Sequence, residues 1–218
     1  MHKPNVGSSG IDNLLRNIQE LKKTDIRKGI QKRLHEFRKL GHGSPDIIFR
    51  ELCFCLLTAN CNAQRCICAQ REIGAGFITL GKAELKKKIR RLVCRFYNNK
   101  TDYIISARSK IDELMSMLHI TQDGKSARKW LVKNIKGLGM KEASHFLRNI
   151  GYSDVTIIDF HIVDLLEKYR LVKKPKSMTS KAYLQIEKKL AEIARLAGMD
   201  MAELDLYLWY METGKVLK

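Results

Sequence analysis

Apolar residues recur every three or four positions along most of this chain, and this spacing predicts amphipathic helices. Residues 11–40 predict one or two helices, with a face formed by Ile11, Leu14, Leu15, Ile18 and Leu21. The same spacing predicts helices over residues 82–93, 100–117, 126–134, 141–150, 163–169, 180–197 and 202–213. Only residues 154–158 have a short strand-like pattern. The pattern therefore predicts an all-α protein.

A nearly apolar segment, IIFRELCFCLLTA, follows Ser44 and Pro45. Serine at the cap and proline at the first helical position form a favourable helix start. Because the helix is apolar on most sides, we expect it to lie in a core, with Cys53 and Cys55 as small buried thiols. We also expect Ser180 to cap the helix over residues 180–197.

Two predicted helices meet at a tight turn formed by Gly137, Leu138 and Gly139. Glycine accepts turn conformations that a Cβ resists, and it lets the backbone approach a partner closely. The first amides of the next helix are free to hold an anion such as phosphate. The arrangement predicts a helix–hairpin–helix.

Lys141 lies in the first turn of the second hairpin helix, where the helix dipole disfavours a cation. This placement favours a phosphate contact or a nucleophilic amine, which can attack a sugar carbon and form a Schiff base. Asp159 follows an apolar run eighteen residues later. A carboxylate there can accept a proton and stabilise positive charge on the sugar. Spacing alone leaves two alternatives open: Lys141 only contacts phosphate, and Asp159 only caps a helix.

The charge balance indicates a polyanionic partner. The 218 residues include 41 Lys and Arg against 23 Asp and Glu, which gives a net charge of +18. Such an excess favours a nucleic-acid partner over the alternative, a generally cationic protein that has no specific partner. No apolar run reaches the roughly 18 residues of a membrane-spanning helix, and the first residues lack the apolar core of a signal peptide. We therefore expect an intracellular protein without a membrane partner.

Cysteine spacing argues against a metal centre. Five cysteines fall within sixteen residues, but they contain no C-x2-C pair and match neither a zinc site nor a common iron–sulfur motif. We interpret them as structural thiols, and an intracellular location argues against stable disulfides, although a pair within the cluster stays open. The six are Cys53, Cys55, Cys61, Cys66, Cys68 and Cys94.

The segment IKGLGMKEASHFL, followed by TIIDFH, resembles the helix–hairpin–helix and Gly/Pro–Asp motif of the base-excision DNA glycosylases. In that superfamily a lysine two residues past the second hairpin glycine marks the bifunctional glycosylase/lyases, and Lys141 occupies this position. Asp159 matches the essential aspartate. One departure is Lys136, which replaces the family's common proline and adds a charge beside the DNA backbone.

Further segments resemble the compact, archaeal-type second class of 8-oxoguanine DNA glycosylases over most of residues 45–218. They are FRELCFCLLTAN, GAGFITL, RFYNNKTDYIISAR and DLYLWYMETGKVLK. The resemblance implies two helical subdomains with the active-site cleft between them: residues 44–152, which contain the hairpin, and residues 1–43 with 153–218. It also implies a monomer without cofactor. No C-x6-C-x2-C-x5-C cluster follows Asp159, so we expect no iron–sulfur cluster.

The implied reaction is excision of 8-oxoguanine from duplex DNA by base flipping. Lys141 would attack C1′ with help from Asp159, and β-elimination from the Schiff base would nick the strand. The resemblance also places a monovalent cation at the backbone carbonyls of Lys133, Ile135 and Leu138. Two alternatives stay open: a glycosylase for another damaged base, and a non-catalytic DNA-binding module.

The resemblance assigns the base pocket as well. Phe96 and Trp209 match the aromatics that sandwich the flipped base, and Asp205 and the carboxylate of Lys218 match acceptors that read its edge. An acceptor suits 8-oxoguanine, whose N7–H is absent from guanine. The alternative is that both aromatics are ordinary core residues. The expected DNA contacts are Lys136, Gly137, Gly139, His161 and Asn60, with Asn62 and Gln64 as weaker candidates; His161 and the amides are equally typical of helix caps.

Overall fold

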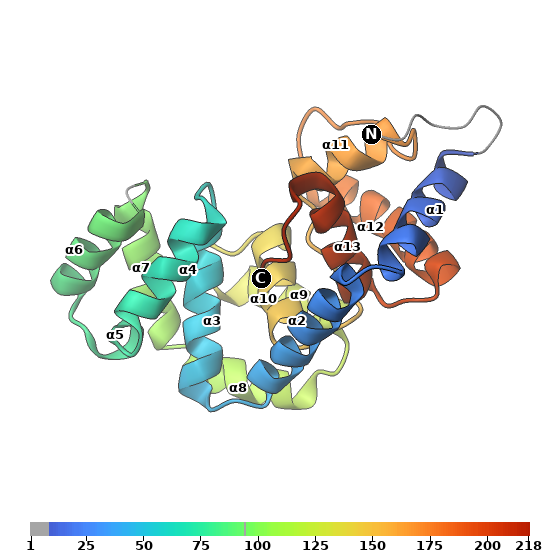
Figure 1. Ribbon diagram of the computed structural model, residues 1–218. Helices are drawn as coiled ribbons and strands as arrows, with labels where there is room; N and C mark the ends of the chain where they lie inside the picture. The colour runs from blue at the N-terminus through green and yellow to red at the C-terminus, as the bar shows by residue number, and fades with distance from the viewer. Residues whose placement is uncertain (1–8, 94) are drawn as a thin grey trace. The chain divides into compact units, whose positions relative to one another are not determined.

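The computed structural model describes residues 9–93 and 95–218, and every regular element in that part of the chain is a helix (Figure 1). The predicted all-α class is therefore confirmed. The helices are α1 (Gly10–Lys22), α2 (Ile26–Gly41), α3 (Pro45–Thr58), α4 (Ala63–Ile73), α5 (Gly76–Thr79), α6 (Lys82–Val93), α7 (Tyr97–Arg108), α8 (Ile111–Ile120), α9 (Gly124–Asn134), α10 (Met140–Asn149), α11 (Phe160–Lys168), α12 (Ser180–Ala197) and α13 (Met201–Thr213).

Contacts divide the chain into two compact units. We call Phe37–Tyr152 the central unit, and Ser153–Lys218 together with the chain up to Glu36 the terminal unit. The central unit contains the helix–hairpin–helix, and the terminal unit contains α11, α12 and α13.

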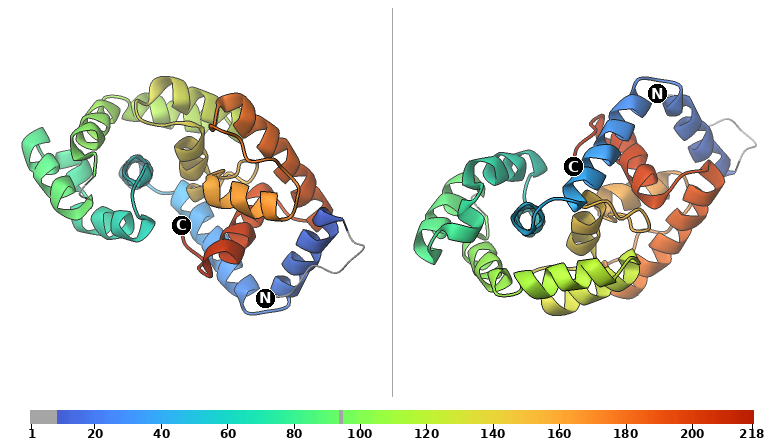
Figure 2. Two further views of the ribbon diagram at one scale, coloured as in Figure 1. Left: turned by 90° about the horizontal axis from the view of Figure 1, so that it is seen from above. Right: turned by 90° about the horizontal axis from the view of Figure 1, so that it is seen from below.

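Helix α3 forms the core of the central unit. Figure 2 shows it end-on, with helices α4 to α10 of the same unit around it. Most of α3 is buried, as its apolar sequence predicts, and Cys53 and Cys55 are both fully buried. Ser44 is the N-cap and Pro45 takes the first turn, but the Ser44 side chain makes no capping hydrogen bond. The start of α3 therefore relies on the preset backbone of proline.

Buried polar groups tie α3 to its neighbours. Glu51 is 1% exposed, and its carboxylate accepts Asn149 Nδ2 at 2.7 Å and Gln70 Nε2 at 2.9 Å. Arg128 of α9 donates to Ser144 Oγ of α10 at 2.9 Å. Because buried polar groups are costly when unpaired, these bonds fix the two hairpin helices against each other and α10 against α3.

Two predicted helix boundaries are wrong. Residues 100–117 are not one helix, because α7 ends at Arg108 and α8 begins at Ile111. Ser109 Oγ donates to the carbonyl of Ser106 at 2.9 Å, a local bond that competes with continued helix. The N-cap of α12 is Thr179, whose side chain accepts the amide of Ala182, so the predicted cap Ser180 is the first helical residue.

Candidate active site

The turn between α9 and α10 requires glycine at one of its two positions. Gly137 has φ +95°, and a Cβ there would lie 2.2 Å from the ring of Tyr103. Both the left-handed backbone and the contact exclude a larger residue. Gly139 has φ −93°, and a Cβ there would meet only the end of the Glu142 side chain, 3.2 Å away. The prediction that the turn needs a backbone conformation reserved for glycine is confirmed for Gly137 and is wrong for Gly139. At Gly139 the predicted advantage that remains is close approach of the backbone to a partner.

Lys141 is the second residue of α10, in the turn where the helix amides begin. Gly139 is the N-cap and has no side chain to bond these amides, which suits them to an anion. The Lys141 side chain is 33% exposed, and its Nζ lies 3.6 Å from Glu142 Oε1. Glu142 was not predicted from the sequence. Its position, three residues past the N-cap, is the signal that could have found it.

Asp159 is the N-cap of α11, with Oδ1 accepting the amide of Ile162 at 3.0 Å. The capping role considered from the sequence is therefore present. It does not exclude chemistry, because a carboxylate carries a second oxygen that can accept a proton. Lys141 belongs to the central unit and Asp159 to the terminal unit.

The segment before Asp159 forms neither a helix nor a strand, and no strand is present among the described residues to pair with it. Its backbone bonds to side chains instead. The Ile157 amide donates to Asp205 Oδ1 at 3.0 Å, and the Ile158 amide donates to Tyr183 Oη at 3.2 Å. Tyr183 Oη in turn donates to the carbonyl of Thr156 at 2.7 Å. The strand-like pattern thus belongs to an irregular segment that side chains of α12 and α13 hold in place.

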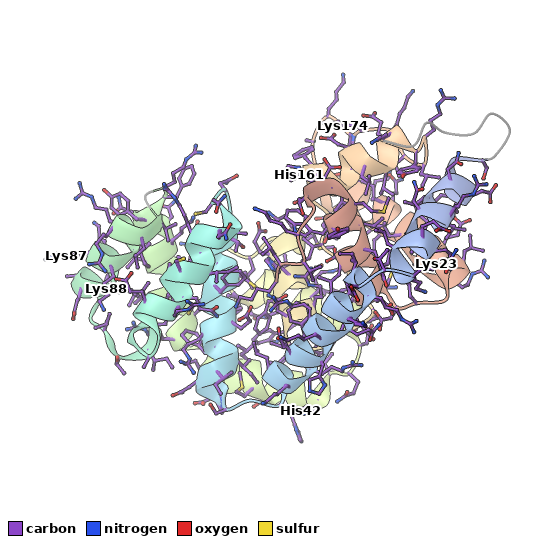
Figure 3. All side chains as sticks on the ribbon, in the orientation of Figure 1. Lys23, His42, Lys87, Lys88, His161 and Lys174 are labelled. Carbon is purple, nitrogen blue, oxygen red and sulfur yellow. The ribbon has the colours of Figure 1, made fainter. Side chains whose placement is uncertain are left out.

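Asp205 is 2% exposed, and Oδ1 also accepts Thr156 Oγ1 at 3.0 Å. This expected base-pocket acceptor therefore has a structural role within the terminal unit. Trp209, one turn further along α13, is half-buried and makes an edge contact with His161, with ring centroids 5.8 Å apart. His161 is exposed in the first turn of α11 (Figure 3). Sequence reasoning named both residues but did not predict that they touch.

Phe96 belongs to the central unit and is 53% exposed, so the alternative of an ordinary core residue is wrong for Phe96. Its φ of +54° is rare for an aromatic residue, and the guanidinium of Arg95 lies 5.6 Å from its ring. Strained backbone of this kind clusters at binding and active sites, so Phe96 remains a candidate for the base pocket.

Asn60, with φ +53°, lines a cavity of about 270 Å³ in the central unit. The other lining residues are Cys61, Asn62, Arg65, Val93 and Arg95. Asn62 caps α4, since Oδ1 accepts the amides of Gln64 and Arg65 at 3.0 and 3.2 Å. The capping alternative therefore describes Asn62, whereas Asn60 remains a candidate for contact with DNA.

The family model described as 8-oxoguanine DNA glycosylase matches residues 30–199, which include the hairpin, Lys141, Asp159 and the segment that leads to Asp159. The chain belongs to the 8-oxoguanine DNA glycosylase family.

Relatives in this family match nearly the whole length of the chain. Proteins named 8-oxoguanine DNA glycosylase/AP lyase from Korarchaeum cryptofilum and Methanocaldococcus jannaschii are each 46% identical to it. The alignments cover 96% and 94% of this chain, and 100% and 99% of the relatives. The resemblance drawn from the hairpin and the C-terminal segments is thereby confirmed.

Solved structures of the 8-oxoguanine DNA glycosylase family share the fold. The Methanocaldococcus jannaschii 8-oxoguanine glycosylase/lyase, crystallised with a 15mer DNA containing 8-oxoguanine, superposes with a TM-score of 0.90 at 45% identity. That match covers 94% of this chain and 99% of the other. The Thermotoga maritima 8-oxoguanine DNA glycosylase gives a TM-score of 0.89 at 37% identity, over 95% and 100% of the two chains.

The five described cysteines differ in their exposure to solvent. Cys53, Cys55 and Cys66 are buried, Cys61 is half-buried, Cys68 is exposed, and all five are free thiols. Burial raises the pKa of the Cys66 thiol, which opposes formation of a thiolate. Cys94 lies outside the described residues.

Within residues 9–93 and 95–218, no three His, Cys, Asp or Glu side chains gather as a metal-binding group. Of the three hairpin carbonyls implied by the family, that of Ile135 accepts the Leu138 amide at 3.2 Å. A carbonyl oxygen has a second lone pair, so a monovalent cation is compatible with this turn. None of the described helices combines the length and apolar character needed to cross a bilayer.

Proposed function

We propose that this protein is a bifunctional 8-oxoguanine DNA glycosylase/AP lyase that acts on duplex DNA inside the cell. The observation that carries the proposal is Lys141, which starts the helix after the Gly137 turn in a chain that is 46% identical to named glycosylase/lyases over their whole length. A non-catalytic hairpin needs only backbone amides and cations. It gives no reason for a primary amine together with an aspartate that is held in place by buried hydrogen bonds.

In the proposed reaction the hairpin amides and Lys136 hold the phosphate backbone, and His161 contacts a second phosphate. The damaged nucleotide leaves the stack, and Asn60 helps to fill the gap. Phe96 and Trp209 stack on the flipped base. Asp205 and the Lys218 carboxylate read its edge, where the N7–H of 8-oxoguanine offers a donor.

Lys141 supplies the nucleophile. Its amine gives up a proton, with Asp159 as acceptor, and bonds to C1′ as the bond from C1′ to the base breaks and its electron pair leaves with the base. The carboxylate of Asp159 also stabilises the positive charge that builds on the sugar. Opening of the sugar gives a Schiff base, and loss of a proton from C2′ expels the 3′ phosphate and nicks the strand.

This chemistry needs neither an iron–sulfur cluster nor another cofactor, and we expect the protein to work as a monomer. A monovalent cation at the carbonyls of Lys133, Ile135 and Leu138 would neutralise charge where the hairpin meets phosphate. No reaction step depends on it.

Borohydride trapping tests the proposal, because reduction converts a Schiff base into a permanent protein–DNA adduct. The wild-type protein should give an adduct on a duplex with one 8-oxoguanine, and Lys141→Gln should give none. Lys129→Gln, which removes an exposed lysine from the preceding helix α9, is the matched control and should trap like wild type. An adduct with Lys141→Gln would reject the assigned nucleophile. If the protein cleaves a duplex with an oxidised pyrimidine or an alkylated purine faster than the 8-oxoguanine duplex, the assigned substrate is wrong.

A further inference from the structure

Helix α6 carries a row of cations along one flank. Lys82, Lys86 and Arg90 are spaced four residues apart, so they lie on one side of the helix, and all three are exposed. The helix packs into the central unit through a different face, formed by Leu85, Ile89 and Val93.

The row faces helix α7, where two of its cations rest on one aromatic ring. Lys86 Nζ lies 5.9 Å and Arg90 Cζ 5.5 Å from the centre of the Tyr97 ring. Lys82 Nζ lies 2.8 Å from Asp102 Oδ1 on the same helix. The ring and the carboxylate restrict three long side chains that would otherwise sample many rotamers, so the row is partly ordered before any ligand arrives.

Asp102 also links this row to the hairpin. Its hydrogen bond with Lys82, together with the charges of Lys82, Lys86 and Lys136, holds the pKa of the Asp102 carboxyl below its ordinary value. Lys136 is the hairpin lysine, and the next residue, Gly137, packs against Tyr103 of α7. Four cations from α6 and the hairpin thus border a single stretch of α7.

Cations four residues apart on a helix repeat about every 6 Å along its axis. A single anion cannot pair with a row of this length, whereas a phosphate backbone presents a continuous row of charges. Each flank of α6 has one ion pair, Lys82 with Asp102 on the α7 side and Arg91 with Glu72 of α4 on the other. Lys86 and Arg90 pair with no carboxylate within the described part of the chain, so their charges remain available on the α7 side. The charge on the α7 side therefore favours an extended polyanion.

We propose that Lys82, Lys86 and Arg90, continued by Lys136, form a phosphate track that binds the DNA backbone beyond the hairpin. The track rests on the proposed function, since it treats DNA as the partner. It would lengthen the duplex contact without reading bases, and it would therefore contribute equally to damaged and undamaged DNA.

The test compares two triple variants of the same helix. Lys82→Gln with Lys86→Gln and Arg90→Gln removes the track. Lys87→Gln with Lys88→Gln and Arg91→Gln removes the same charge from the rest of the helix surface, where Figure 3 labels Lys87 and Lys88. Dissociation constants for an undamaged duplex are measured by fluorescence anisotropy over a series of salt concentrations.

The track variant should bind about tenfold more weakly than wild type, and its salt slope should shrink by about 2 to 3, since each lost phosphate contact removes roughly 0.9. The control variant should change the slope by less than about 1. Equal salt slopes and affinities for the two variants would overturn the track, because net charge alone would then account for the contribution of α6 to DNA binding.

Borohydride trapping at saturating protein separates this inference from the proposed function. The track variant should still form the covalent adduct on 8-oxoguanine duplex, because Lys141 is unchanged. If wild type forms no adduct while the salt slopes differ as expected, the proposed function fails and the track stands. If wild type traps and the slopes do not differ, the track fails and the function stands.

Discussion

Tyr183→Phe tests how the terminal unit holds Asp159. Tyr183 is 1% exposed, and its hydroxyl bonds both the carbonyl of Thr156 and the amide of Ile158. The variant keeps the ring and removes only the oxygen. Both backbone groups then lose this partner, and the described part of the chain has no strand beside the segment that could replace it.

The cost follows from burial. A buried polar group left without its partner costs about 1–3 kcal/mol. Two groups are affected here, and small backbone shifts can recover part of the loss. We therefore expect Tyr183→Phe to lower the free energy of unfolding by about 2 kcal/mol. In a protein of this size each kcal/mol moves the Tm by about 2–4 °C, which gives a decrease of about 4–8 °C.

Tyr207→Phe is the matched control. Tyr207 is also fully buried in the terminal unit, but its hydroxyl has no hydrogen-bond partner within the described part of the chain. Burial, together with the nearby Glu203 carboxylate, raises the pKa of the Tyr207 phenol, so the hydroxyl stays protonated in this control comparison. Removing this hydroxyl breaks no bond, so the Tm should stay within about 2 °C of wild type or rise.

Two assays decide the matter. Thermal unfolding followed by circular dichroism compares both variants with wild type, and single-turnover base release measures the chemistry on an 8-oxoguanine duplex. Because Asp159 directly follows Ile158, Tyr183→Phe should slow base release by at least about tenfold, given that a shift of ~1 Å can cost about 100-fold. Equal Tm values for the two variants would refute the reasoning.

Gly137→Ala should lower the free energy of unfolding by about 2–5 kcal/mol in urea titrations, from a left-handed backbone and a clash with Tyr103, whereas Gly139→Ala should cost less than about 1 kcal/mol. Equal effects at the two positions would contradict the turn geometry. Removal of Lys218 should reduce the preference for 8-oxoguanine over guanine duplex by about tenfold or more in competition binding, with a smaller change in affinity for undamaged DNA. An unchanged preference would exclude Lys218 from the base pocket.

The features that could be predicted from the sequence are those with local causes. Apolar spacing gave the helices because each helix buries one face, and the apolar segment after Pro45 gave the core helix of the central unit. Gly137 marked the hairpin because its backbone excludes other residues. The errors at Ser109 and Ser180 are also local, since a single side-chain hydrogen bond decides where each helix ends or begins.

Contacts between residues distant in sequence could not be predicted this way. The bond from Asp205 to Ile157 spans 48 residues, and the His161 ring touches Trp209 at the same separation. For Phe96 the resemblance favours the base pocket over a core, but its left-handed φ and its exposure are set by the folded backbone at the start of α7. No pattern of apolar and polar positions carries such information.

The two principal residues of the proposed chemistry are therefore positioned by different means. Lys141 depends on the backbone of its own hairpin, so a short motif is enough to reveal it. Asp159 depends on Tyr183 and Asp205, which hold the segment before it and come from α12 and α13. Damage to the hairpin should weaken DNA binding together with chemistry. Loosening of the segment before Asp159 should slow chemistry more than it weakens binding to undamaged DNA, because the hairpin contacts are unchanged and only the His161 contact lies close to that segment.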